Sequence, residues 1–140
     1  RKYPDPYARV VALEKAFADD VALGNVAHWR FIPYLQLHEF EALLLSDPTK
    51  FDVRFNEHAD KIQSLITICS QFASPELIND GQTSAPSKRI IREIPEYEGA
   101  KASAGPLIAQ KIGLSTMRQK CSHFNEWLTK LENLRDKGCS

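Results

Sequence analysis

The stretch WRFIPYLQL, from Trp29 to Leu37, decides the fold expected for this 140-residue chain. It is rich in aromatic and β-branched residues and is too short and too apolar for a surface helix, so it predicts a β-strand over about residues 30–36. Pro33 cannot donate a backbone hydrogen bond, which places this strand at a sheet edge or at a local irregularity. Together with the helical patterns around it, this strand predicts an α/β fold that is mostly helical.

Helices are predicted on both sides of this strand. Asp5 and Pro6 are typical of a helix start, and an apolar stripe that ends at Gly24 predicts a helix over residues 6–23. Helical spacing, helix-forming residues and capping residues predict further helices at residues 38–45, 56–72, 86–95, 106–112, 115–120 and 123–135. Residues 79–86 and 99–105 are expected to be loops.

The composition limits the classes of protein that fit. Eighteen Lys and Arg residues balance eighteen Asp and Glu residues, so the net charge is zero and any contact with nucleic acid would need a local patch. The length predicts a single domain over residues 1–140. The absence of a long apolar run and of a signal peptide predicts a soluble cytoplasmic protein with no membrane partner. Cys69, Cys121 and Cys139 lack CxxC spacing, so buried or incidental thiols are expected.

The first candidate site is the junction QLHEFE at residues 36–41, because the ends of strands in α/β sheets present side chains to ligands. Glu39 and Glu41 offer oxygen ligands for Mg²⁺ or Mn²⁺, and His38 is a candidate auxiliary residue. On extended backbone the two carboxylates point to the same side, whereas on a helix they diverge by about 200°. Alternatively, the glutamates only place negative charge in the first turn of a helix, where the dipole favours it.

The second candidate site is the segment SAPSKR at residues 84–89. Ser87, Lys88 and Arg89 place a hydroxyl and two cations at a helix N-terminus, and this combination suits a phosphate group. Basic residues in a first turn oppose the helix dipole, which favours an anionic partner nearby. The alternative is a solvated basic turn. The sequence has no HExxH, GxSxG or phosphate-binding glycine loop, so zincin, serine-hydrolase and P-loop chemistry are unsupported.

Four segments resemble a bacterial family known as domain of unknown function DUF4276. They are FIPYLQLHEFEALLLSDP at residues 31–48, INDGQTSAPSKRI at 78–90, GPLIAQKIGL at 105–114 and CSHFNEWLTKLE at 121–132. Members of this family are similar to Toprim-type metal-dependent nucleases, including the overcoming-lysogenization-defect nucleases. They are often discussed beside ATPases in defence-type gene neighbourhoods.

The resemblance implies that this chain is the C-terminal part of a Toprim-like domain. The glutamate and the Asp-x-Asp of a Toprim site would precede the region that residues 3–23 resemble, and the chain contains neither. By the same resemblance, Glu39 and Glu41 would bind Mg²⁺ or Mn²⁺ and Lys88 would be the catalytic lysine. The residue pattern at the helix start, and not the resemblance, predicts that Ser87 and Arg89 contact phosphate.

Two functions follow from these expectations. In the first, the chain is part of a metal-dependent nuclease that acts on nucleic acid and is inactive without its N-terminal segment, with an exposed strand edge that favours self-association. In the second, the chain is a non-catalytic module that docks on a partner such as an ATPase.

Overall fold

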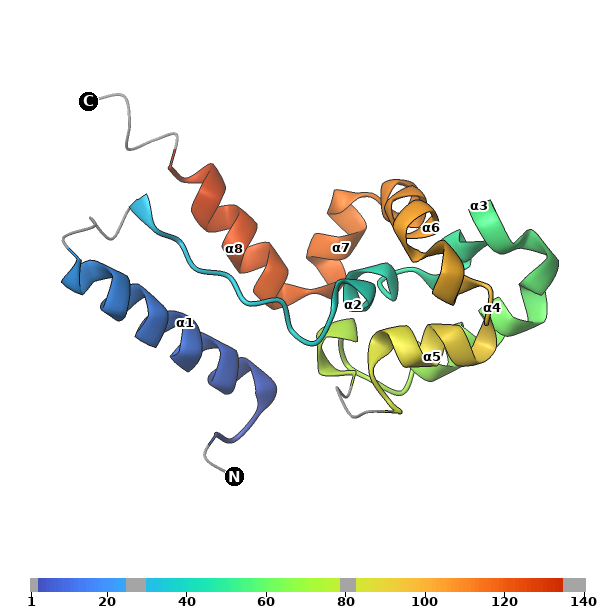
Figure 1. Cartoon of the computed structure of the whole chain (residues 1–140), viewed down its shortest axis with the longest axis horizontal. Helices are drawn as coiled ribbons and strands as arrows, with labels where there is room; N and C mark the ends of the chain where they lie inside the picture. The colour runs from blue at the N-terminus through green and yellow to red at the C-terminus, as the bar shows by residue number, and fades with distance from the viewer. Residues whose placement is uncertain (1–2, 25–29, 79–82, 135–140) are drawn as a thin grey trace. The chain divides into compact units, whose positions relative to one another are not determined.

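The computed structural model describes residues 3–24, 30–78 and 83–134, which fall into two units (Figure 1). Unit 1 combines Arg1–Leu37 with His123–Ser140, and unit 2 is His38–Ser122. The single domain expected from the chain length stays a prediction. Within the described ranges, no helix is long and apolar enough to cross a membrane.

Unit 1 contains helices α1 (Pro6–Leu23) and α8 (Ser122–Glu132), the second of which begins one residue before the unit boundary. The Asp5 carboxylate accepts a hydrogen bond from the Ala8 N–H at 2.8 Å, and the proline that follows Asp5 has no N–H to satisfy. The prediction of a helix over residues 6–23 is confirmed. Helix α8 was predicted over residues 123–135, and the last of these lies outside the described residues.

The prediction of a strand over residues 30–36 is wrong. Residues 31–36 form neither helix nor sheet, and no strand is present in residues 3–24, 30–78 or 83–134. The part of the chain that the structure describes is therefore helical, so the α/β assignment and the C-terminal part of a Toprim-like sheet are both corrected. A strand needs a neighbouring strand, whereas this segment runs along helices α1 and α8 (Figure 1).

Side chains replace the missing strand partner in unit 1. The Tyr34 ring stacks on the Trp127 ring of α8 at a centroid distance of 4.5 Å. The Leu35 N–H donates to Glu14 Oε1 of α1 at 2.7 Å, and the same oxygen lies 2.8 Å from Nε2 of His123. Glu14 and His123 are 7% and 5% exposed, so this carboxylate joins all three parts of unit 1 in a nearly dry environment.

Unit 2 contains short helices that match most of the predicted ones within a few residues. The α-helices are α2 (Phe40–Leu44), α3 (Asp52–Phe55), α4 (Ala59–Cys69), α5 (Pro86–Glu93), α6 (Tyr97–Ile112) and α7 (Leu114–Lys120). Short 3₁₀ turns lie between them: η2 (Pro48–Phe51), η3 (Asn56–His58) and η4 (Pro75–Leu77).

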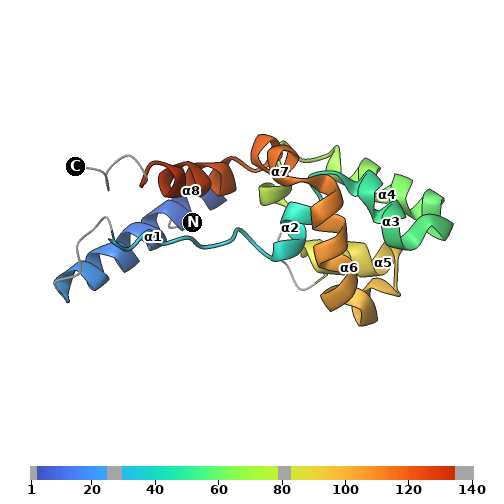
Figure 2. The ribbon, with the colours of Figure 1, turned by 90° about the horizontal axis from the view of Figure 1, so that it is seen from above.

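Helix α2 lies in the core of unit 2. Its residues Ala42 and Leu44 are fully buried, and Leu43 is 6% exposed. Helices α5 and α6 and the turn η4 contact it, and both views show α2 next to α6 (Figures 1 and 2). Because Ala42, Leu43 and Leu44 point to different sides of this short helix and are all buried, several elements must pack around α2.

The loop predicted over residues 99–105 is also wrong, because α6 runs through it from Tyr97 to Ile112. Apart from its glycines, this segment carries several good helix formers, and burial of Ala104 and Ile108 adds tertiary support. Pro106 lies inside α6 with its side chain exposed. Self-association was predicted from an exposed strand edge, and the described residues supply no such edge.

The described cysteines form no disulfide bond. Cys121 is fully buried, and burial raises the pKa of its thiol to about 12. Cys69 is partly buried, and burial raises its pKa to about 11. Both are therefore protonated thiols at neutral pH, while Cys139 lies outside the described residues.

Replacing Glu14 by alanine is expected to lower the free energy of unfolding by about 2–3 kcal/mol, because the Leu35 N–H and the His123 ring lose a buried acceptor. Urea denaturation measures this loss. Glu14→Gln keeps an acceptor oxygen and should lose less. Lys15→Ala, at an exposed position of the same helix, should change stability by less than about 0.5 kcal/mol. Equal effects of Glu14→Ala and Lys15→Ala would show that the Glu14 carboxylate does not hold the parts of unit 1 together.

Candidate functional site

The structure brings the two candidate motifs together at Glu39 and Ser87, which are 48 positions apart in the sequence. Glu39 Oε2 accepts a hydrogen bond from the Ser87 N–H at 2.8 Å, and Oε1 accepts one from the Ser87 hydroxyl at 3.0 Å. Ala85 occupies the N-cap position of α5 and has no side-chain acceptor. The Glu39 carboxylate therefore caps α5 from outside the helix, where the dipole favours negative charge.

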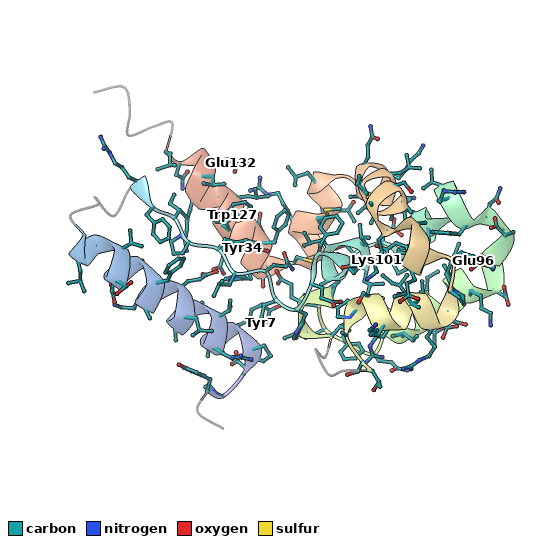
Figure 3. All side chains as sticks on the ribbon, in the orientation of Figure 1. Tyr7, Tyr34, Glu96, Lys101, Trp127 and Glu132 are labelled. Carbon is teal, nitrogen blue, oxygen red and sulfur yellow. The ribbon has the colours of Figure 1, made fainter. Side chains whose placement is uncertain are left out.

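Glu41 faces a different helix. Its Oε1 accepts a hydrogen bond from the Tyr97 hydroxyl at 3.4 Å and lies 3.7 Å from Nζ of Lys101, and both partners belong to α6. The Lys101 side chain (Figure 3) is 40% exposed, whereas the Glu41 side chain is 13% exposed. The contacts of Glu39 with α5 and of Glu41 with α6 match the divergent arrangement expected on a helix.

His38 sets the direction of the chain before Glu39. Its φ of 67° is the one positive φ of a non-glycine residue in the described part of the chain. Histidine is among the residues that tolerate this conformation better than most. The next residue, Glu39, returns to extended backbone with φ −142° and serves as the N-cap of α2. The turn at His38 thus leads directly into the glutamate that caps α5.

The three predicted phosphate-contacting residues have different surroundings. Ser87 is 2% exposed and is bound to Glu39. Arg89 donates from Nε to the Ser84 carbonyl at 2.8 Å, and its guanidinium lies 5.2 Å from the centre of the Phe72 ring. Lys88 is exposed. Lys88 therefore differs from Ser87 and Arg89, because its ammonium faces solvent and makes no hydrogen bond or ion pair with a described residue.

The two carboxylates do not make a metal site by themselves. Within the described ranges, no group of three or more His, Cys, Asp or Glu side chains is placed to hold a metal ion. Both oxygens of Glu39 already accept hydrogen bonds. The Lys101 ammonium lies close to Glu41 Oε1, so a metal ion at this oxygen would compete with the lysine. The arrangement does not fit the six-oxygen shell that Mg²⁺ prefers.

Tyr97 and Lys101 belong to this site although the sequence patterns did not single them out. Tyr97 is 1% exposed, and its pKa is raised well above the ordinary tyrosine value, first by burial and then by the charges of Glu41 and Glu39. The two residues lie four positions apart, which puts them on one face of a helix. The signal was missed because the segment after Tyr97 was expected to be a loop.

Stability should fall at alkaline pH because of Tyr97. In the unfolded chain this phenol ionises near pH 10, whereas in the folded protein its pKa is raised, so the unfolded state loses protons first. The free energy of unfolding is therefore expected to decrease as pH rises above about 10. Chemical denaturation of Tyr97→Phe between pH 8 and 11 should show a weaker decrease. The same pH dependence in both proteins would contradict this account.

Removing the Glu39 carboxylate should destabilise unit 2. Glu39→Ala leaves the buried Ser87 N–H and hydroxyl without their acceptor, and we expect a loss of about 1–2 kcal/mol in the free energy of unfolding. Glu98→Ala, an exposed glutamate in the first turn of α6, is the matched control and should cost less than about 0.5 kcal/mol. Thermal or urea denaturation distinguishes the two, and equal losses would contradict a capping role.

Comparison with known proteins is consistent with the motifs quoted from the sequence. The sequence model of one family, described as domain of unknown function (DUF4276), matches residues 1–132. Searches of curated proteins and of solved structures find no match. Because the family match covers more than half of the sequence, the chain belongs to the family of domain of unknown function DUF4276.

Proposed function

We propose that this chain contributes part of the site of a metal-dependent nuclease, with Glu39, Glu41 and Lys88 as its contribution. The observation that supports this most is the contact between Glu39 and Ser87, because it joins the acidic and the basic motif across 48 positions of sequence. Acidic and basic side chains gathered at one place are what phosphodiester hydrolysis requires.

Each residue has a distinct part in this proposal. The exposed Lys88 ammonium binds a non-bridging oxygen of the phosphate and offsets the charge that develops there. Ser87 holds the Glu39 carboxylate in place, and Lys101 does the same for Glu41. Arg89 donates to the Ser84 carbonyl, which leaves the rest of its guanidinium for the predicted contact with phosphate.

The site needs more ligands than this chain provides. Two carboxylates are fewer ligands than Mg²⁺ or Mn²⁺ needs, so the other ligands would come from residues outside this chain. The chain alone is therefore expected to be inactive. The likeness to Toprim-type nucleases is proposed for the acidic and basic residues and not for the fold of this chain.

A second candidate function is a non-catalytic module that docks on a partner such as an ATPase. The observation that favours it is that Glu39 and Glu41 both have structural partners within unit 2, so both carboxylates have a role without any reaction. The two functions differ in what the exposed Lys88 does.

In the protein encoded by the complete gene, Lys88→Ala is expected to lower nuclease activity by an order of magnitude or more, because a charge that stabilises the transition state is lost. Its effect on the free energy of unfolding should stay below about 0.5 kcal/mol, since the side chain is exposed. Cleavage of single- and double-stranded DNA and RNA with Mg²⁺ or Mn²⁺, together with thermal melts, measures both.

Lys111→Ala removes an exposed lysine near the end of α6 and is the matched control. It should leave cleavage unchanged. Full activity of a correctly folded Lys88→Ala protein would remove Lys88 from the site. The absence of cleavage by the complete wild-type protein with either metal would favour the docking module.

A further inference from the structure

Phe40 is an exposed aromatic residue in the middle of the acidic motif. It stands between Glu39 and Glu41 and is 46% exposed, although the rest of α2 is largely buried. The other large apolar residues exposed in the described part of unit 2, Leu107 and Leu114, are aliphatic. An aromatic ring that is open to solvent offers a flat face on which a base can stack.

The Phe40 ring has a defined position against α6. A Cβ atom built on Gly105 would lie 3.5 Å from Cε1 of Phe40 and 3.6 Å from the Tyr97 hydroxyl oxygen. The edge of the ring and the Tyr97 hydroxyl therefore flank the same buried glycine. The ring thus packs against α6 at this edge while nearly half of the residue remains exposed.

Charged groups lie on the same face of α6 as Gly105, because Lys101 is four positions before it. The hydroxyl of Tyr97 contacts Glu41 Oε1 at 3.4 Å, and the same carboxylate oxygen lies 3.7 Å from the Lys101 ammonium. On the other side of Phe40 in the sequence, Glu39 contacts Ser87, the neighbour of the exposed Lys88. An exposed aromatic ring in the part of unit 2 that also carries the exposed Lys88 and the 40% exposed Lys101 matches a ligand that alternates flat rings and phosphates.

We propose that Phe40 stacks on an unpaired base of a single-stranded nucleic acid whose phosphates contact Lys88 and Lys101. This inference rests on the proposed nuclease function and adds a substrate class to it. Bases of a single strand are free to leave their neighbours and stack on a side chain, whereas the faces of paired bases in a duplex are already covered. The ring therefore selects single strands, and the lysines hold any strand.

The test measures binding of the 140-residue chain to a fluorescent oligothymidine strand and to a duplex of equal length, by fluorescence anisotropy at low salt without metal. The wild-type chain is expected to bind the single strand more tightly. Phe40→Ala should weaken binding of the single strand by about fivefold or more, as removal of a stacking side chain does, and should leave duplex binding unchanged. Phe40→Trp should retain the single-strand affinity.

Two further variants separate stacking from charge and from general surface effects. Leu114→Ala removes another exposed apolar side chain of unit 2 and should leave binding of both probes unchanged. Lys88→Ala should weaken binding of both probes by a similar factor, because phosphate contacts do not depend on base pairing. Circular dichroism of each variant confirms that it is folded.

The outcomes distinguish the stacking inference from the proposed function. An unchanged single-strand affinity in Phe40→Ala, or an equal loss for both probes, overturns stacking and leaves the nuclease proposal intact. Failure of the wild-type chain to bind the single strand also overturns stacking, while the cleavage assay of the complete protein decides the nuclease proposal separately. Selective loss of single-strand binding with rescue by Phe40→Trp supports the inference.

Discussion

The burial of a five-residue helix constrains the rest of unit 2. Helix α2 is too short to be stable in isolation, so it depends on the helices that enclose Ala42 and Leu44. Helices α5 and α6 pack against it, and the glutamates at its N-terminus reach one of these helices each. The charged cluster is thus positioned by the same packing that forms the core, and it is held by α2 and not by a mobile loop.

Start signals located some helices correctly, whereas Pro106, which was expected to begin a helix, lies inside α6. Asp5 with Pro6 and Pro86 mark helix starts in the sequence and in the structure. The prediction for residues 31–36 was wrong because aromatic and β-branched composition is typical of half-buried extended segments and does not show which element packs on them. Here Tyr34 stacks on a helix residue, Trp127, and no strand is present in the described ranges.

The sequence predicted several residues of the candidate site but not the contacts among them. Glu39 and Lys88 were found from local patterns, and a missing side-chain acceptor at Ala85 is a readable sign that another residue must cap α5. Tyr97 and Lys101 were not found, because their contact with Glu41 depends on how α6 packs on α2. Such contacts between distant parts of a chain are set by tertiary structure, which one sequence does not reveal.

Unit 1 is assembled from two segments that lie far apart in the sequence, which has a consequence for biosynthesis. Glu14 and His123 are 109 positions apart, so their contact cannot form until His123 has left the ribosome, long after α1 has emerged. The residues of unit 2 all emerge earlier and are free to fold first. Helix α1, which carries Val11 and Phe17 at its surface, therefore remains without its partner α8 while the whole of unit 2 is being synthesised.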